Sequence, residues 1–368
     1  MSLAIQSVEI DAYTIPTDAP EADGTLEWNE TTIVIVRIHC GKLVGLGYTY
    51  ADRAAAVLIE DHLTSLVLRS DPMSPPATCH AMYRAIRNLG RDGIASMAIS
   101  AVDVALWDLK ARLLNLPIVT LIGAQRQSIP IYGSGGFTSY SDEQLQRQLG
   151  CWAQQGIKAV KMKIGMHPER DLERVRCARD AICNADLYVD ANGAYQVKQA
   201  LEMAAQFSDY GVTWFEEPVT SDNLSGLRFI RERAPSQMEI AAGEYGYNQL
   251  YFRRMLQSGA VDVLQADATR CGGVTGFLKA AAEADSFERP LSAHTAPSLH
   301  GHLCCGVSCA RNVEYFHDHV RIEQMLFHGA LFAEDGTLTP DRLAPGFNLT
   351  LKESDAARFE VYRGERHG

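Results

Sequence analysis

The sequence predicts an α/β protein in which a barrel of parallel strands follows a smaller α+β domain. Two observations lead to this prediction. Between residues 129 and 316, short apolar runs alternate with helical patterns about every 20–30 residues, as expected for successive βα units. Before residue 125, strand-like segments come first and helical patterns follow, which is typical of an α+β domain.

The α+β domain begins with three predicted strands. Residues 4–13 alternate between apolar and polar, residues 31–40 are rich in β-branched side chains, and residues 43–50 form a third strand. Residues 16–30 are polar and rich in Pro and Asp, so we expect a loop there. Long loops of this kind are often lids or binding loops.

Helical patterns extend from about residue 53 to residue 113. The clearest is GIASMAISAVDVALWDLKARLLN, where Ala98, Val102, Ala105 and Leu109 form an apolar stripe with helical spacing. We place this domain at residues 1–125.

The barrel is predicted for residues 126–350. Its eight strands are expected at 129–136, 159–165, 186–193, 212–218, 238–244, 261–267, 290–294 and 312–316. Eight alternating βα units imply a (β/α)8-type barrel. The remaining residues, 351–368, are polar and irregular, and we expect them to return towards the first domain.

The composition is that of a soluble globular enzyme, with 46% hydrophobic and 21% charged residues. A net charge of −11 argues against nucleic acid or an anionic membrane surface as the main partner. The N-terminus lacks the features of a secretory signal, and we see no transmembrane segment. Nine cysteines without a CxxC pair indicate a reduced, cytoplasmic compartment.

Ionisable side chains fall at the carboxyl ends of seven predicted barrel strands. From the second strand to the eighth they are Lys163, Asp190, Glu216, Glu244, Asp267, His294 and Glu314. These ends converge on one mouth of a barrel, where active sites lie. Buried charge is rare, so seven such positions indicate a functional site rather than structural charges.

Asp190, Glu216 and Glu244 come from three adjacent strands. Converging carboxylates repel one another unless a cation lies between them, and oxygen ligands favour a hard ion such as Mg²⁺. The alternative is a set of barrel acids that form salt bridges.

Two further pairs indicate acid–base chemistry. Asp267 and His294 lie on adjacent strands, where the carboxylate would fix the tautomer of the imidazole and raise its basicity. Lys161 and Lys163 share one face of a strand. We expect their repulsion and a nearby metal to lower the pKa of Lys163 into a range useful for a base. The structural alternative for both lysines is pairing with barrel acids.

The sequence resembles the enolase superfamily, specifically its mandelate racemase subgroup. The motifs KMKIG, VDANG, WFEEP, AAGE, QADATRCGG and LSAH occur in the family's order and spacing, and AVDVALWDLKARLLNLPIVTLIGA resembles the end of its capping domain. The resemblance covers nearly the whole chain. It implies an α+β N-terminal capping domain over a modified TIM barrel, (β/α)7β, and a homo-oligomer.

The resemblance also implies roles for individual residues. Asp190, Glu216 and Glu244 would hold Mg²⁺, which the carboxylate of a small-molecule substrate would chelate. Lys163 would remove the α-proton, and His294, paired with Asp267, would stand on the opposite face. Lys161 and Asn192 would help to bind the carboxylate or the enediolate, and a protonated Glu314 would donate a hydrogen bond to the intermediate.

Some positions depart from the family pattern. Arg270 stands where the family often has lysine, which keeps the charge but changes the geometry. His317 follows Glu314 closely and is a candidate for substrate binding, with a surface role as the alternative. His300 and His302 form an HxH pair that we interpret as structural.

The shared chemistry is enolisation of a carboxylate, and two outcomes fit a lysine and a histidine on opposite faces. We favour dehydration of a sugar acid to a 2-keto-3-deoxy acid; the alternative is a racemase or epimerase of a 2-hydroxy acid. The polar residues of the 17–30 segment suit a polyhydroxy substrate. A metallohydrolase of the amidohydrolase type would need an HxH after the first barrel strand, where IYGSGG has none. A non-catalytic relative would be expected to lose some of the seven residues.

Overall fold

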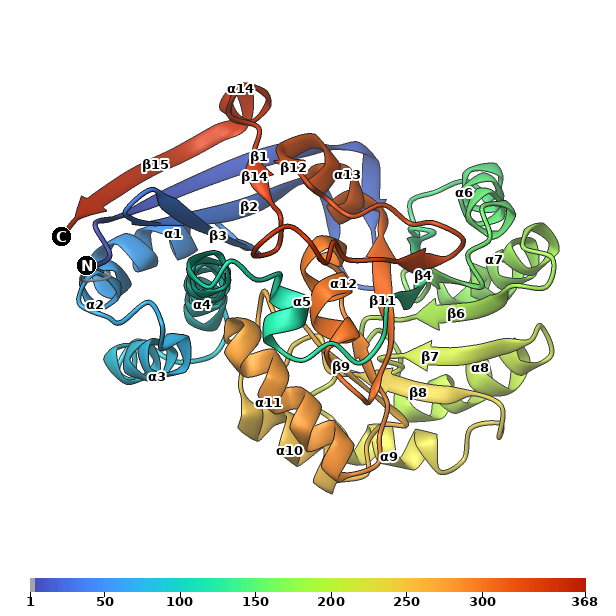
Figure 1. Cartoon of the computed structure of the whole chain (residues 1–368). Coiled ribbons are helices and arrows are strands. Elements are labelled where there is room, and N and C mark those ends of the chain that lie inside the picture. The colour runs from blue at the N-terminus through green and yellow to red at the C-terminus, as the bar shows by residue number, and fades with distance from the viewer. Residues whose placement is uncertain (1–3) are drawn as a thin grey trace.

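The computed structural model describes residues 4–368, which form a capping domain beside a barrel (Figure 1). The capping sheet is antiparallel in the order β15-β1-β2-β3. Its strands are Ser7–Ala22 (β1), Glu27–Cys40 (β2), Leu43–Tyr50 (β3) and Glu360–His367 (β15). The predicted arrangement of strands followed by helices in this part of the chain is confirmed.

The apolar run TTIVIV belongs to a strand that is buried on both faces. In β2, Val34 and Val36 pack into the core of the capping domain, whereas Ile33 and Ile35 belong to the core that continues into the barrel. Because successive side chains of a strand point to opposite faces, an unbroken apolar run is what such a strand requires.

The loop expected at residues 16–30 is absent, and that prediction is wrong. Most of this stretch extends β1 and β2 into a long hairpin, with an irregularity in the pairing between Pro16 and Glu21. The turn itself is short, because Asp23 Oδ1 accepts hydrogen bonds from the amides of Thr25 and Leu26. Proline and aspartate interrupt a strand pattern in sequence, yet an irregular strand edge and an Asx turn accommodate both.

The helices of the capping domain cover one face of its sheet. They are Ala54–Leu58 (α1), a π-helical turn at Ile59–Leu63 (η1), Thr64–Leu68 (α2), Pro75–Ala85 (α3) and Ile94–Leu113 (α4). The apolar stripe predicted for α4 is fully buried. Helix α4 lies directly on β3, since a Cβ on Gly47 would come within 2.3 Å of the Ala101 carbonyl oxygen.

Within residues 4–368, eight parallel strands close into a barrel, as predicted. The strands are Ile129–Gly135 (β4), Ala159–Lys163 (β5), Asp186–Asp190 (β6), Val212–Glu216 (β7), Glu239–Ala242 (β8), Val263–Ala266 (β9), Leu291–Ala293 (β10) and Ala310–Phe316 (β11). Parallel pairing of β11 with β4 closes the ring. A two-residue strand, Thr337–Leu338 (β13), adds to β4 in antiparallel fashion.

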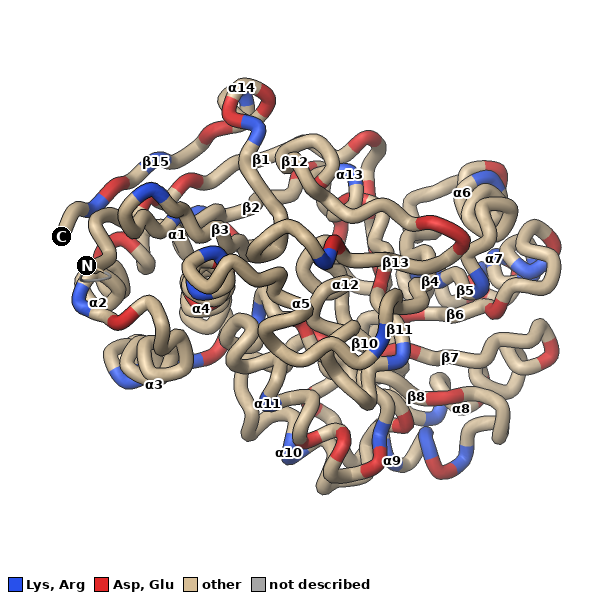
Figure 2. The backbone as a smooth tube through the Cα atoms, viewed as in Figure 1, with Lys and Arg blue, Asp and Glu red and all other residues tan. Residues whose placement is uncertain are grey.

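Helices connect the barrel strands on the outside. They are Asp142–Gln154 (α6), Pro168–Ala181 (α7), Val197–Ser208 (α8), Leu224–Arg231 (α9), Gln249–Gln257 (α10), Gly273–Ser286 (α11) and Pro297–Cys305 (α12). The short helix Ile118–Leu121 (α5) precedes β4, and His317–Leu326 (α13) follows β11. Figure 2 shows acidic and basic residues interspersed on α6, α7 and α9.

The chain beyond the barrel is more regular than expected. It contains the short strands Phe327–His328 (β12) and Thr350–Leu351 (β14), the helix Glu353–Ala356 (α14) and a 3-10 turn at Ala357–Phe359 (η2). The chain then ends in β15, which pairs with β1 from Ser7–His367 to Tyr13–Glu360. The polar sequence of β15 reflects its position at the edge of the sheet, where most of its side chains are exposed.

Buried polar contacts join the two parts of the molecule. Asp103 of α4 accepts hydrogen bonds from the amide and hydroxyl of Thr275 at 2.9 and 2.7 Å. Tyr48 of β3 donates to Glu323 of α13 at 2.5 Å, and Thr49 donates to the Thr269 carbonyl at 2.7 Å. These contacts fix the capping sheet over the barrel mouth.

None of the helices in residues 4–368 has the length and apolar character needed to cross a membrane. The cysteines of this region are all free. Both histidines of the HxH pair are buried in α12: His300 contacts the Thr295 carbonyl and the Ala268 amide. The ring of His302 packs against Phe347, and neither ring nitrogen finds a hydrogen-bond partner within residues 4–368.

We predict that His302 makes the fold sensitive to acid. Burial lowers the pKa of His302 to about 4, whereas an unfolded chain has a histidine pKa of about 6.5. As the pH falls below 6.5, the unfolded chain binds a proton at this histidine while the folded chain does not. The free energy of unfolding therefore decreases between pH 6.5 and pH 4, by about 3 kcal/mol. In urea unfolding at pH 7 and pH 4.5, His302→Met should lose less stability than the unmodified chain. The exposed His328→Met is the control, and equal losses in all three proteins would contradict the assignment.

Candidate active site

Strand register brings the predicted residues to one end of the barrel. Lys163 of β5 pairs with Asp190 of β6, and Asp190 pairs with Glu216 of β7. Asp267 and His294 directly follow β9 and β10. Because the strands are parallel and in register, side chains that are distant in sequence meet at the mouth.

The three predicted metal ligands form a tight, buried cluster. Asp190, Glu216 and Glu244 are each at most 3% exposed, and each offers an oxygen within 4.8 Å of those of the other two. Within residues 4–368, Glu244 Oε2 is buried without a hydrogen-bond partner. A buried carboxylate oxygen without a donor is costly, and a hard divalent cation would satisfy it. The donor set therefore fits Mg²⁺.

Lys161 and Lys163 bind these acids directly. Lys161 Nζ lies 2.6 Å from Glu216 Oε1 and 2.8 Å from Glu314 Oε1. Lys163 Nζ lies 2.6 Å from Asp190 Oδ2 and donates to Asn192 Oδ1 at 3.1 Å. Each of the two lysine Nζ atoms thus contacts at least two oxygen atoms of neighbouring side chains.

Without a metal ion, the effect of Lys161 on the pKa of Lys163 is outweighed by the surrounding carboxylates. Burial and the Lys161 charge both act downward, but Asp190, Glu244 and Glu314 raise the pKa of Lys163 above its ordinary value. The lysines are outnumbered by carboxylates, so repulsion between them is not the dominant effect. In this arrangement Lys163 is a protonated ion-pair partner.

The acids respond unequally to their surroundings. Burial opposes ionisation of Asp190, yet Lys163 and Lys161 hold its pKa below the ordinary range. Burial and the neighbouring Asp190 raise the pKa of Glu216 well above its ordinary value. Burial and the charge of Glu244 also raise the pKa of the next residue, Glu217. The sequence interpretation passed over Glu217, although it is the second acid of WFEEP.

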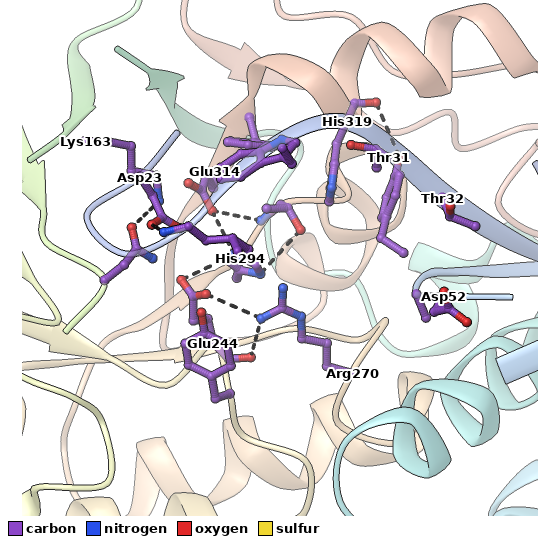
Figure 3. Close-up of a pocket in the computed structure, with 18 of the residues that line it drawn as sticks. Asp23, Thr31, Thr32, Asp52, Lys163, Glu244, Arg270, His294, Glu314 and His319 are labelled. Carbon is purple, nitrogen blue, oxygen red and sulfur yellow. Dashed lines mark hydrogen bonds and ion pairs between the residues drawn. The ribbon is translucent and has the colours of Figure 1, made fainter. Parts of the chain in front are cut away.

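His294 and Asp267 form the predicted pair. His294 Nδ1 lies 2.8 Å from Asp267 Oδ2, and Asp267 Oδ1 accepts hydrogen bonds from the amide and hydroxyl of Thr269 at 2.7 Å. Burial acts upward, but the hydrogen bond with His294 and the charge of that ring hold the pKa of Asp267 below its ordinary range. His294 Nε2 lies between Glu244 and Glu314, at 3.5 and 3.7 Å from their carboxylates (Figure 3).

Neighbouring cationic groups favour the ionised form of Glu314 in this arrangement, whereas the proton expected on it belongs to the form that acts on the intermediate. Burial acts upward, but Lys161 and His294 lower its pKa to about 2. Its carboxylate also accepts hydrogen bonds from Ser134 Oγ at 2.6 Å and the Thr295 amide at 3.1 Å. Glu314 must therefore gain a proton before it can donate one.

Arg270 bridges the metal-type cluster and the histidine pair. Its guanidinium lies 3.4 Å from Glu244 Oε1 and 3.6 Å from Asp267 Oδ2. Burial acts downward, but Glu244 and Asp267 raise the pKa of Arg270. The planar group can reach both acids at once, which a lysine ammonium does less well.

These residues surround a cavity of about 490 Å³ between the barrel mouth and the capping domain (Figure 3). The predicted residues that line it are Lys163, Asn192, Glu244, Arg270, His294 and Glu314. Lys161, Asp190, Glu216 and Asp267 are almost completely buried and are not part of this lining among residues 4–368. The cavity wall is therefore supported by a second layer of charges.

The capping domain contributes residues that the sequence interpretation did not identify. They are Thr31, Thr32, Tyr50, Ala51 and Asp52, whereas Asp23, Leu26, Trp28 and Glu30 lie in the 17–30 segment that was expected to face the substrate. Tyr50 stacks on His319 of α13 with ring centroids 3.4 Å apart. The sequence signal for these capping residues was the polar segment 16–30 between two strands, for which a loop was predicted.

His317 does not line this cavity. It borders a separate surface pocket, where its Nε2 lies 3.0 Å from Asp18 Oδ2. As the first residue of α13, it lies beyond the strand end that carries Glu314 to the mouth, and the structure offers no contact in support of the expected substrate binding.

Fold and site together define an enolase-type barrel. Two family models match the chain: mandelate racemase / muconate lactonizing enzyme, N-terminal domain, over residues 12–123, and enolase C-terminal domain-like, over residues 144–355. The chain belongs to the mandelate racemase and muconate lactonizing enzyme family of the enolase superfamily, which confirms the resemblance.

The chain is also similar to individual enzymes and to solved structures of this family. The arabinonate dehydratase of Saccharolobus solfataricus is 31% identical, covering 86% of each chain. A mandelate racemase/muconate lactonizing enzyme-like protein from Rubrobacter xylanophilus has a crystal structure with a TM-score of 0.95 and 49% identity, covering 97% of this chain and all of that one. A racemase from Streptomyces coelicolor A3(2) with bound magnesium has a TM-score of 0.91 and 28% identity, covering 97% and 100%.

We predict that Glu244→Gln weakens Mg²⁺ binding roughly ten-fold or more, because it removes one of three anionic donors. Titration calorimetry measures the affinity. Glu232→Gln, at an exposed acid directly after α9, is the control and should bind Mg²⁺ like the unmodified chain. Equal affinities for all three proteins would show that Glu244 is not a ligand.

Proposed function

We propose that the chain is a Mg²⁺-dependent dehydratase of sugar acids. One observation carries the proposal: Lys163 and His294 line the same cavity as Glu244 of the acidic cluster, and they come from strands that are not neighbours in the barrel. An acid–base pair that approaches a bound carboxylic acid from two sides can remove an α-proton and assist a leaving group. The similarity to an arabinonate dehydratase supports this reaction.

The α-proton of a carboxylate is very weakly acidic, because its removal gives a dianion. Mg²⁺ held by Asp190, Glu216 and Glu244 would supply positive charge to the substrate carboxylate and to the enediolate. Asn192 lines the cavity and would contact the carboxylate, and the positive charge of the buried Lys161 would stabilise it.

The remaining steps use side chains that line the cavity. Lys163 takes the α-proton, which leaves an enediolate. The imidazolium of His294, oriented by Asp267, gives a proton to the β-hydroxyl as the carbon–oxygen bond breaks, so that water leaves. The resulting enol becomes the 2-keto-3-deoxy acid. Once protonated, Glu314 donates a hydrogen bond to the enediolate.

The cavity wall suits a polyhydroxy acid. Asp23, Thr31, Thr32 and Asp52 of the capping domain offer hydroxyl and carboxylate groups around the space left by the barrel residues. Hydroxyl groups of a sugar acid require such partners when they leave water.

Racemisation of a 2-hydroxy acid is the second candidate. It is favoured by the position of His294 Nε2, which faces the cavity within 3.7 Å of Glu314 and can return a proton to the α-carbon. The similarity to the Streptomyces coelicolor racemase supports it.

We further propose a cytoplasmic homo-oligomer. Free cysteines throughout residues 4–368 suit a reducing compartment. Phe332 and Leu343 are 62% and 91% exposed, and apolar side chains of this kind suit contact with a second copy.

Screening a library of sugar acids with Mg²⁺, with detection of 2-keto-acid products, tests the reaction. Product formation from at least one sugar acid supports dehydration. Solvent deuterium at the α-carbon of a recovered substrate, without a keto acid, favours racemisation instead. A library that gives neither result contradicts the proposal.

Lys163→Met and His294→Asn should each lower kcat by roughly 10²–10⁴-fold, the usual range for a proton-transfer residue. Both variants should retain Mg²⁺ affinity, because neither residue belongs to the metal-type cluster. Lys158→Met, an exposed lysine beside the same strand, is the control. Full activity in either variant would remove that residue from the mechanism.

A further inference from the structure

A second group of potential metal ligands lies outside the active-site cavity. Asp18 and Glu21 of β1 and His317 of α13 each offer an atom within 4.8 Å of those of the other two. His317 Nε2 lies 3.0 and 3.2 Å from the two carboxylate oxygens of Asp18. Asp18 and His317 border a surface pocket of about 400 Å³, so an ion can reach them from solvent.

Glu21 is the unusual member of this group. It is 1% exposed, and within residues 4–368 its Oε1 has no hydrogen-bond partner. Its Oε2 accepts a hydrogen bond from Trp28 Nε1 at 2.9 Å. An ionised carboxylate buried in this way has no donor for Oε1, whereas a coordinated cation would satisfy that oxygen.

The nearby Arg321 forms its hydrogen bonds with other groups than Asp18 and Glu21. Arg321 donates to Asp318 Oδ1 at 2.6 Å and to the Pro16 carbonyl at 2.7 Å, and Thr31 donates to the other oxygen of Asp318. Asp318 is therefore satisfied, whereas Asp18 is paired with the imidazole of His317 and Glu21 accepts a hydrogen bond from Trp28 alone. Two carboxylates beside one histidine leave negative charge for a divalent cation to balance.

We propose that Asp18, Glu21 and His317 form a second divalent-cation site, separate from the acidic cluster in the barrel. One imidazole nitrogen and two carboxylate oxygens suit Zn²⁺, with water in the remaining position, whereas the all-oxygen cluster of the barrel suits Mg²⁺.

Such an ion would fasten the capping hairpin to the barrel. Figure 1 shows the outer part of β1 and β2 beside α13, and the three ligands lie on the two sides of this contact. Through its hydrogen bond to Trp28, Glu21 also supports a residue that lines the active-site cavity. The ion would therefore hold the cavity wall in position without touching the substrate.

Zinc titration of the full chain in excess Mg²⁺ tests the proposal. The control is His328→Ala, at an exposed histidine. The unmodified chain and this control should each bind one Zn²⁺ that His317→Ala does not bind, or binds roughly ten-fold or more weakly. Glu21→Gln should show the same loss. A crystal soaked in Zn²⁺ should give an anomalous peak between the three side chains.

Zn²⁺ should also slow hydrogen exchange of residues 17–28 in the unmodified chain but not in His317→Ala. His317 is a surface residue, so this variant tests the site even if Glu21→Gln does not fold. Equal zinc binding by the unmodified chain and His317→Ala would overturn the proposal, as would an anomalous map without a peak at this position.

Discussion

The structure depends on an excess of buried carboxylate around two lysines at the mouth of the barrel. Asp190, Glu216, Glu244 and Glu314 are removed from water within a few ångströms of one another. The energetic cost of burying unpaired charge is high, so such a cluster persists only if cations or protons balance it. Lys161 contacts three of these acids, which makes it the centre of the arrangement.

This constraint explains why the chemistry requires a divalent ion. In the present arrangement the carboxylates keep Lys163 protonated and raise the pKa of Glu216. A cation between Asp190, Glu216 and Glu244 would neutralise the acids that hold the proton on Lys163. The same three acids would thus serve two purposes: they bind the ion that attracts an anionic substrate to an acidic protein, and they release the lysine to act as a base.

The capping domain completes the site. The barrel supplies Lys163, Glu244 and His294, while the hairpin and β3 supply Asp23, Trp28 and Tyr50 to the cavity wall. Buried contacts such as that between Tyr48 and Glu323 hold the two parts together. The cavity is therefore lined by residues of both domains.

The barrel and most of its site residues could be predicted from sequence, because the alternation of apolar runs and helical patterns shows where each parallel strand ends. Lys163, Asp190 and His294 were identified from their positions alone, and the family motifs reinforced them. Protonation states were not predictable, since the pKa of Lys163 depends on how many acids surround it in space. The hairpin was missed because proline and aspartate at a strand edge resemble a loop, and the burial of Glu21 within it does not follow from that pattern.

The proton balance of Mg²⁺ binding tests the central claim most directly. Calorimetric titrations at pH 8 in buffers of different ionisation enthalpy measure the number of protons released per ion. If protons balance the carboxylates until the cation binds, about one proton should be released per Mg²⁺, and fewer should be released in Lys163→Met. Mg²⁺ binding without proton release would contradict this account of the site.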